Sequence, residues 1–479
     1  MVALPTLPNI SMSGTLLERG LRSLVGAWRG IAGGDETAQL GRSGELDARD
    51  IERLRGLFND CLEARGGEVS ARARAAALGR LYLGLNDAGK VSFLKVLAGG
   101  FGADPGLLDK KIADMQQAAD PAARHKAERK LRQALTPPRQ RLLTQFTALP
   151  QGVKFLVDLR ADALRFRKEA PELAIVDADL EDLFIAWFDV GFLELQRISW
   201  NSPAALLEKL IAYEAVHAIE SWDDLRNRLD ADRRCYAFFH PRMPLEPLIF
   251  VEVALVKGIA GNVQALLDQT QPVMDAREAD TAIFYSISNT QTGLRGISFG
   301  NFLIKRVVDD LSRDLPNLKQ FSTLSPIPGF RAWLDETIAE GAPDLVDAKA
   351  RDALREVLGQ RFSKGMLPGL LQDRSWAENA ALADALKPVL LRLCARYLLS
   401  AQDKGGKPRD PVARFHLSNG ATVHRLNWLG DRSKNGMKQS AGMMVNYLYR
   451  LDDIDQNHER FVREGTVAAS GEVKRLADL

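Results

Sequence analysis

The sequence predicts a protein in two parts, an all-helical bundle domain over residues 1–185 and a mixed α/β domain over residues 186–479. Three observations predict this fold class. Hydrophobic residues recur at helical spacing through the first part, β-branched and aromatic runs begin near residue 235, and helical patterns then alternate with such runs. A chain of 479 residues is also longer than one compact domain, which usually has about 100 to 200 residues.

The first part consists of amphipathic stretches. Ile51, Leu54, Phe58 and Leu62 share one helical face, and the glycines that follow at 66–67 end the pattern. Other stretches have the same character and little β-branched content. They cover residues 70–85, 104–119, 121–135 and 151–169.

Strand candidates in the second part are short runs rich in β-branched and aromatic residues. They are CYAFFH (235–240), LIFVEVALV (248–256), TAIFYSI (281–287), LKQFSTL (318–324), VARFHL (412–417) and ATVHRLNW (421–428). A Ser-Asn-Gly turn separates the last two, which predicts a hairpin. Helices are expected over 297–313 and 381–400.

Charge and cysteine content exclude several classes of protein. The 64 Lys and Arg residues against 62 Asp and Glu residues leave a formal net charge of +2, too little for the basic footprint of a nucleic-acid-binding protein. Only three cysteines occur, without a CxxC pair, so neither a disulfide framework nor a cysteine-rich zinc site is expected.

The sequence also favours a cytoplasmic protein. No apolar run reaches the roughly 18 to 20 residues of a membrane span, and no secretory signal pattern is present. We therefore expect no membrane insertion. Residues 15–30 are amphipathic and contain arginines, as an organelle transit peptide does, but Glu18 argues against that function.

A glycine loop follows the strand candidate 281–287 and precedes a predicted helix. In the loop Ser288–Gly296, Gly293 and Gly296 allow backbone N–H groups to turn toward an anion, and a helix N-terminus adds partial positive charge. The spacing matches neither the dinucleotide-binding nor the Walker A pattern. Taken alone, the loop slightly favours purely structural glycines, which are common at such turns.

A second motif overlaps this loop. Residues 296–300, Gly-Ile-Ser-Phe-Gly, satisfy the G-x-S-x-G pattern of α/β-hydrolase nucleophiles. That fold needs the serine directly after a strand, whereas Ser298 follows the end of the apolar run by about ten residues. Ser298 is therefore expected to lie inside a helix, where its side chain packs or caps.

The six histidines show no metal-site spacing, so no metal ion is expected. His416 is the main catalytic candidate, because the strand predicted over 412–417 places His416 and Phe415 on opposite faces and one of them could enter a cleft. His240 precedes a proline-rich stretch that could fix its side chain. A structural role is expected for His217.

Several separated blocks of the second part resemble one known family. They are HPRMPLEPLIFVEVAL (240–255), FYSISNTQTGLRGISFGNFLIKRVV (284–308), FSTLSPIPGF (321–330), FHLSNGATVHRLNW (415–428) and NYLY (446–449). In this order they resemble the malonyl-CoA decarboxylases. The resemblance implies a helical oligomerisation domain, a homotetramer and a catalytic domain with the fold of GCN5-related N-acetyltransferases.

The resemblance also implies site residues. The loop that wraps the pyrophosphate of CoA in that fold falls on Gln291, Gly293, Leu294, Arg295 and Gly296. Catalysis is assigned to Ser325 and His416, and Ser286 and Tyr449 match further positions that line the site.

The implied reaction converts malonyl-CoA to acetyl-CoA and CO2 and needs no metal or organic cofactor. Loss of CO2 leaves an enolate that the thioester itself stabilises, so the protein must orient the carboxylate, place donors at the oxyanion and return a proton to carbon. The alternatives are a CoA-dependent N-acyltransferase, an acyl-CoA thioesterase that uses Ser298, and a helical scaffold that only binds acyl-CoA.

Overall fold

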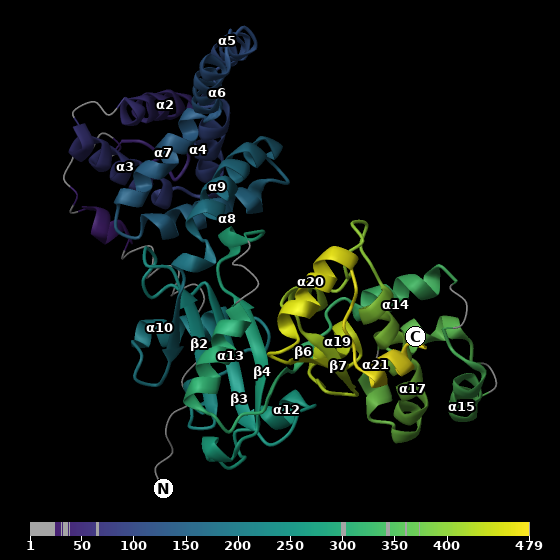
Figure 1. The fold of residues 1–479 in the computed structure, drawn as a ribbon. Coiled ribbons are helices and arrows are strands. Elements are labelled where there is room, and N and C mark those ends of the chain that lie inside the picture. Colours follow the sequence, from purple (N-terminus) through teal and green to yellow (C-terminus); the bar gives the residue numbers. More distant parts are fainter. Residues whose placement is uncertain are drawn as a thin grey trace.

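The computed structural model describes residues 24–29, 31, 37, 39–63, 67–297, 303–341, 345–359, 362–372 and 374–478. Helices form the first part of the chain up to Trp187, and a mixed sheet with its covering helices forms the rest. Figure 1 shows the helical part at one end, the strands β2–β4 beside it, and the C-terminal helices on the far side of the sheet. The predicted fold class is confirmed. The amphipathic stretch 15–30 lies largely outside the described residues.

Aspartate and asparagine caps and early prolines set the starts of many N-terminal helices. The carboxylates of Asp47, Asp104 and Asp120 each accept a backbone N–H of the first turn, and Pro105 and Pro121 occupy the first helical positions. The helices are α2 (Ala48–Leu62), α3 (Gly67–Gly84), α4 (Asp87–Gly100), α5 (Pro105–Gln116), α6 (Pro121–Leu135), α7 (Pro138–Gln145), α8 (Gly152–Phe166) and α9 (Ala174–Trp187).

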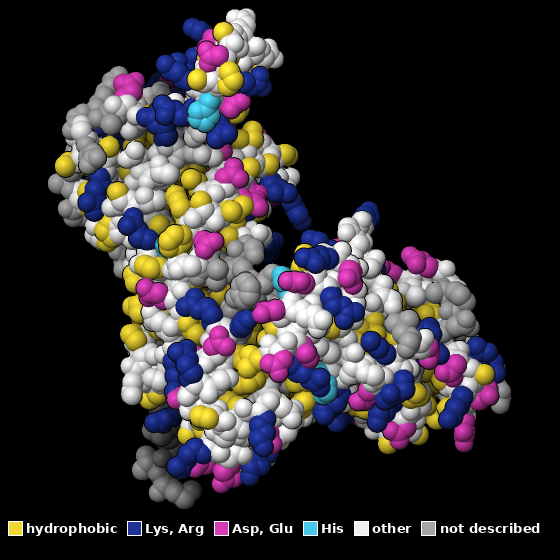
Figure 2. Space-filling model, viewed as in Figure 1, with side chains coloured by type: hydrophobic (Ala, Val, Ile, Leu, Met, Phe, Trp, Pro, Cys, Tyr) yellow, Lys and Arg dark blue, Asp and Glu magenta, His cyan; other side chains and the backbone are white. Residues whose placement is uncertain are grey.

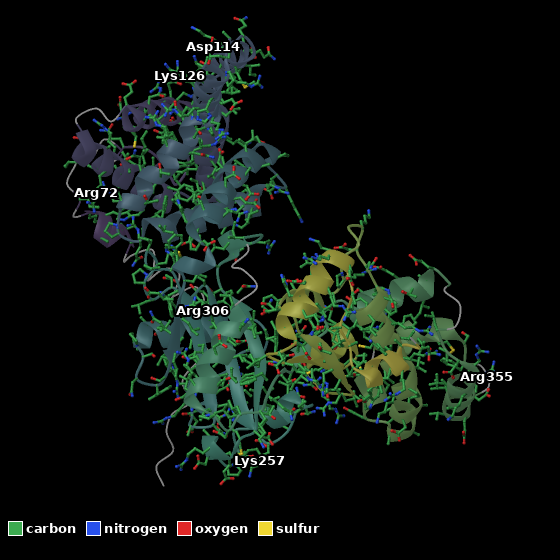
Figure 3. The ribbon with its side chains drawn as sticks, viewed as in Figure 1. Arg72, Asp114, Lys126, Lys257, Arg306 and Arg355 are labelled. Atoms are coloured by element: carbon green, nitrogen blue, oxygen red, sulfur yellow. The ribbon has the colours of Figure 1, made fainter. Side chains whose placement is uncertain are left out.

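The helices α5 and α6 pair with one another and project from the bundle (Figure 1). Neither helix buries a residue. Asp114 and Lys126, labelled in Figure 3, lie toward the outer end of this pair. Its apolar side chains are consequently left partly exposed.

The sheet has eight strands in the order β1-β2-β3-β4-β5-β8-β6, and β7 pairs with β8. All neighbours are antiparallel except β4 and β5, which are parallel over only Thr281–Phe284 and Gln320–Thr323. The strands are β1 (Glu194–Ile198), β2 (Arg233–Phe239), β3 (Ile249–Val256), β4 (Thr281–Asn289), β5 (Gln320–Thr323), β6 (Ser325–Pro326), β7 (Thr422–Asn427) and β8 (Met444–Tyr449).

Helices cover both faces of this sheet. Helix α13 (Leu303–Asp314) buries Val307 and Leu311 in the core that contains Phe284, whereas α10 (Ala204–Tyr213) and α11 (Trp222–Arg228) pack on the face of Cys235. Arg306 of α13, labelled in Figure 3, lies over the Phe238 ring of β2, 5.6 Å from its centre. The remaining helices are α12 (Val263–Leu266), α14 (Phe330–Ala339), α15 (Ala348–Leu358), α16 (Leu367–Leu370), α17 (Ala380–Ser400), α18 (Pro411–Ser418), α19 (Lys434–Ser440), α20 (Ile454–Glu464) and α21 (Gly471–Leu476).

One strand prediction is wrong. The run VARFHL (412–417) is helix α18, so the expected hairpin with β7 does not form. Asp410 caps this helix by accepting the N–H groups of Val412 and Ala413, and Pro411 takes the first helical position. These start signals outweigh the strand propensity of the apolar residues, and Gly420 at a φ of 78° follows the end of the helix.

The other strand candidates match β2, β3, β4, β5 and β7, and the two expected helices match α13 and α17. The sequence predicts no strand at β1, β6 or β8. Among the described residues, no helix is long and apolar enough to cross a membrane. Figure 2 shows basic and acidic side chains interspersed on the visible face, without a large area of one sign.

Candidate active site

The side chains of Ser325, His416 and Tyr449 form one hydrogen-bonded chain. Ser325 begins β6, Tyr449 ends β8, and His416 lies in the last turn of α18. Oγ of Ser325 lies 3.2 Å from Nε2 of His416, and the hydroxyl oxygen of Tyr449 lies 2.7 Å from Nδ1 of the same ring. The fold thus brings these three predicted site residues together around one imidazole.

One arrangement of protons satisfies every bond in this chain. The Ser325 hydroxyl donates to Oγ1 of Thr323 at 2.9 Å. Oγ1 of Thr323 also accepts the backbone N–H of Tyr447 at 3.0 Å. Ser325 then accepts the Nε2–H of His416, which leaves Nδ1 of His416 free to accept the hydroxyl of Tyr449. His416 is therefore assigned the neutral tautomer protonated at Nε2.

Burial keeps these groups uncharged. The exposed fractions of Ser325, His416 and Tyr449 are 5%, 2% and 2%. Desolvation lowers the pKa of His416 to about 3 and raises the pKa of Tyr449 far above its usual value. The ring of Tyr447 stacks on the imidazole, with 4.5 Å between the ring centres. At neutral pH the site thus offers neutral donors and acceptors rather than a charged histidine.

Ser286 lies on β4 and contacts a different group, the buried carboxylate of Glu214. Its hydroxyl lies 2.9 and 2.7 Å from the two oxygens of Glu214, and Ser288 lies 3.4 Å from each of them. Glu214 also accepts the N–H groups of Val216 and His217, which fixes the turn after α10. Within the described part of the chain, no hydrogen bond joins this cluster to Ser325, His416 or Tyr449.

Strand β4 changes its pairing at Ser286. Glu252 of β3 faces Ser286 and Val253 faces Phe284, so a β-bulge leaves Tyr285 without a register partner. The pairing of β4 with β5 ends at Phe284, whose carbonyl accepts the N–H of Leu324. Beyond these residues β4 is paired with neither β5 nor β6, so no strand pairing joins Ser286 to Ser325.

The glycine loop forms a single 3₁₀ turn, η5 (Thr292–Leu294). Gln291, Gly293 and Leu294 are buried, and the side-chain amide of Gln291 donates to the carbonyl of Pro247 at 3.0 Å. Arg295 and Gly296 are exposed, and Gly296 has a φ of 86° that favours glycine. Of the five predicted CoA-binding residues, only Arg295 and Gly296 therefore face solvent.

Other predicted groups have structural partners or lie outside the described residues. His240 bonds to the carbonyl of Trp187 and to the N–H of Arg242, which fits a structural role. Ser298 of the G-x-S-x-G motif is not among the described residues. No group of three or more metal-ligating side chains is found in the described part of the chain.

A cavity of about 670 Å³ adjoins Tyr449. It is lined by Lys319, Gln320, His424 and Arg450, among others. Tyr449 is one of its lining residues, so the cavity borders the hydrogen-bonded chain at that residue. Sequence reasoning did not find this feature, because its lining residues come from the ends of β5, β7 and β8.

Two further polar residues of the site, Glu214 and Thr323, were also missed. Their roles depend on partners 72 and 124 residues away in sequence, Ser286 and Tyr447. No short motif around Glu214 or Thr323 signals these contacts. The aspartate and proline before α18, in contrast, were a readable helix-start signal.

Comparison with known proteins places this geometry in a family. Residues 191–478 match the family model described as the malonyl-CoA decarboxylase C-terminal domain, and residues 101–188 match the N-terminal domain model. The mitochondrial malonyl-CoA decarboxylase of Anser anser anser is 36% identical over 95% of this chain and 93% of its own length. That of Rattus norvegicus is 37% identical over 90% and 87%.

Solved structures agree with these matches. The crystal structure of malonyl-CoA decarboxylase from Rhodopseudomonas palustris is 47% identical, with a TM-score of 0.81 over 89% of this chain and 99% of that chain. The enzyme from Agrobacterium vitis is 46% identical, with a TM-score of 0.80 over 88% and 99%. The chain therefore belongs to the malonyl-CoA decarboxylase family.

Proposed function

We propose that this protein is a carboxy-lyase that converts malonyl-CoA to acetyl-CoA and CO2 without a metal or organic cofactor. The observation that carries the proposal is the buried chain Ser325–His416–Tyr449 in a member of this family. Its groups are neutral donors and acceptors, which suit a reaction that develops negative charge on a thioester oxygen.

The bond changes are balanced without an outside electron acceptor. The bond between the malonyl carboxylate carbon and the α-carbon breaks, and its electron pair forms an enolate conjugated with the thioester carbonyl. CO2 leaves, and one proton is added to the α-carbon. Each turnover thus consumes one proton, which must come from solvent through a protein group or an ordered water.

Ser325 and His416 act as a pair in this proposal. They orient the malonyl carboxylate out of the thioester plane, and His416, or a water that it holds, returns the proton to carbon. Tyr449 donates its hydroxyl to Nδ1 of His416, and in this proposal the adjoining cavity is the route by which solvent protons reach it. One well-placed donor to an oxyanion stabilises a transition state by roughly 3 to 4 kcal/mol.

The CoA part of the substrate is assigned to the glycine loop. Arg295 and Gly296 are exposed and can meet the pyrophosphate, whereas Gln291, Gly293 and Leu294 hold the loop in shape from beneath. Ser286 is assigned to the lining of the site, at the point where β4 leaves β5.

A single assay separates this function from its rivals. Purified protein is incubated with malonyl-CoA while CO2, acetyl-CoA and free thiol are followed together. We expect equal amounts of CO2 and acetyl-CoA and no free thiol. Free thiol with malonate would instead indicate a thioesterase, and free CoA that forms only with an added amine would indicate an N-acyltransferase.

Assembly and location follow the same resemblance. We expect a homotetramer joined partly through the helical part, and the projecting α5–α6 pair supports this because Leu107, Ile112 and Leu135 are 44%, 39% and 54% exposed. A cytoplasmic location stays our prediction for this chain. Fractionation of the source cells with immunodetection of the protein tests it.

A further inference from the structure

Helix α8 of the helical part holds the glycine loop of the catalytic part. Nη1 of Arg160 donates to the carbonyl of Gly293 at 2.9 Å and to the carbonyl of Arg295 at 3.0 Å. A Cβ placed on Gly293 would lie 1.8 Å from the carbonyl oxygen of Val157, so the loop backbone rests directly on α8. Figure 1 shows α8 at the junction of the helical bundle and the sheet.

Two carboxylates fix the guanidinium of Arg160 in this pose. Nε lies 2.8 Å from Asp177 and Nη2 lies 3.2 Å from Glu181, both on α9. Arg160 itself is only 2% exposed. The planar group therefore makes four hydrogen bonds in fixed directions, two to α9 and two to the loop, a geometry that lysine cannot reproduce.

The same arrangement controls charge beside the loop. Arg160 and Arg167 balance Asp177 and Glu181. An oxygen of Glu181 lies 3.7 Å from the position that a Cβ on Gly296 would take. Without Arg160, the uncompensated carboxylate of Glu181 would face the segment where an anion is expected, and it would repel a pyrophosphate.

We propose that Arg160 is a positioning residue for the nucleotide half of the substrate, acting through the backbone of Gly293 and Arg295. The helical part then completes the CoA site in addition to any role in assembly. This inference rests on the proposed function, since it needs the loop to bind the CoA pyrophosphate. It requires the chemistry at Ser325 and His416 to be independent of Arg160.

The test compares Arg160→Lys with Arg139→Lys. Arg139 is also 2% exposed, and it bonds to two backbone carbonyls and one carboxylate, but its partners Leu97, Ala98 and Asp179 all lie in the helical part. Each substitution keeps the positive charge but removes the planar guanidinium and its hydrogen bonds in several directions. Both should lower the thermal unfolding midpoint to a similar degree, so they share the purely structural effect.

Only Arg160→Lys should affect the nucleotide. We expect its Kd for CoA and its KM for malonyl-CoA to rise about tenfold, with kcat within about twofold of wild type. Malonyl-pantetheine lacks the nucleotide and pyrophosphate, so its kcat/KM should be the same in both variants and the wild type. An Arg160→Lys protein that binds CoA as Arg139→Lys does would overturn the inference.

Hydrogen exchange of the wild-type protein gives a second measurement that does not depend on the variants folding. Added CoA should slow amide exchange in residues 290–297 and also in α8 around Arg160, but not around Arg139. Protection of the loop without protection of α8 would contradict the positioning role of Arg160 but would leave the proposed function standing. Unchanged exchange in the loop, with unchanged CoA affinity in Gly296→Val, would instead remove the loop from the proposed function.

Discussion

The hydroxyl of Tyr449 and Nδ1 of His416 lie 2.7 Å apart, at the end of the imidazole opposite to Ser325. This bond determines which tautomer His416 adopts, because a hydroxyl that donates to Nδ1 leaves the proton on Nε2. Tyr449 is thus a candidate for setting the direction of proton supply to the substrate.

Tyr449→Phe should lower kcat by about 10- to 100-fold with a smaller change in KM, since the variant loses the donor that orients the imidazole. Tyr447→Phe is the matched control. Tyr447 stacks on the same ring, but its hydroxyl has no hydrogen-bond partner in the described structure. Steady-state kinetics of both variants test this prediction. Equal losses of kcat would show that the two tyrosines act only by packing around His416.

Ser325 and His416 should behave as one unit although they stand 91 residues apart in sequence. Either Ser325→Ala or His416→Asn should lower turnover strongly and leave CoA affinity near normal. The double variant should lose little more than the worse single variant, because groups that act together show non-additive losses. Turnover and CoA affinity are measured for all four proteins after circular dichroism confirms folding. Losses that multiply strictly would contradict the pair.

The depressed pKa of His416 predicts a pH effect on stability. Its pKa is about 3 in the folded protein against an ordinary value of 6.5, so the unfolded chain binds the extra proton between these limits. The stability that neutral His416 contributes is complete above pH 6.5 and is lost progressively as the pH falls toward 3. The loss is up to about 1.4 kcal/mol per pH unit.

A comparison with His416→Gln isolates this effect from other titrating groups. Glu252, whose pKa is raised to about 8 by burial, contributes in the opposite sense, since its stabilising effect is lost as pH rises from 4.5 through 8. Both proteins carry Glu252, so its contribution cancels in the difference between their thermal unfolding midpoints. That difference should shrink between pH 7 and pH 5. A constant difference would mean that His416 does not stay neutral in the fold.

The sequence predicted the fold class and five of the described strands, because β2, β3 and β4 contain long apolar runs and β5 and β7 contain β-branched or aromatic residues. It missed β8, whose partners β5, β6 and β7 arrive from distant segments. The strand prediction for 412–417 is wrong because it gave the apolar residues more weight than the helix-start signal of Asp410 and Pro411, which decides the structure.

The site residues could be predicted from the family resemblance, but the contacts between them could not. That Ser325 and Tyr449 share one imidazole follows from the antiparallel pairing of β6 with β8 and from α18 packing beside them. That Gly293 is required for contact with Val157, rather than for an anion, follows from the approach of α8. Such facts depend on tertiary contacts that no local pattern encodes.

Ser286 and Ser288 offer a matched pair for testing the lining of the site. Both hydroxyls approach Glu214, but Ser286 is closer, at 2.7 and 2.9 Å, and lies at the β-bulge. If Ser286 faces the substrate, Ser286→Ala should lower kcat/KM for malonyl-CoA by roughly tenfold, the worth of one hydrogen bond to a charged group. Ser288→Ala should change it less than about twofold. Equal kinetic effects in the two variants would place both serines in a structural role only.

The exposed apolar residues of the α5–α6 pair lead to a final prediction about assembly. Leu107 and Ile112 are 44% and 39% exposed, and both lie on α5, which buries no residue within the chain. Their replacement by aspartate should therefore cost little in the monomer, whereas a buried charge in a subunit contact costs several kcal/mol. Light scattering during size-exclusion chromatography should give a tetramer for the wild type and a smaller species for Leu107→Asp combined with Ile112→Asp. Val462→Asp on α20 is the control, because that side chain is 64% exposed and lies outside the helical part. If the double variant keeps the wild-type mass while Val462→Asp lowers it, the contact between subunits lies on the catalytic part instead.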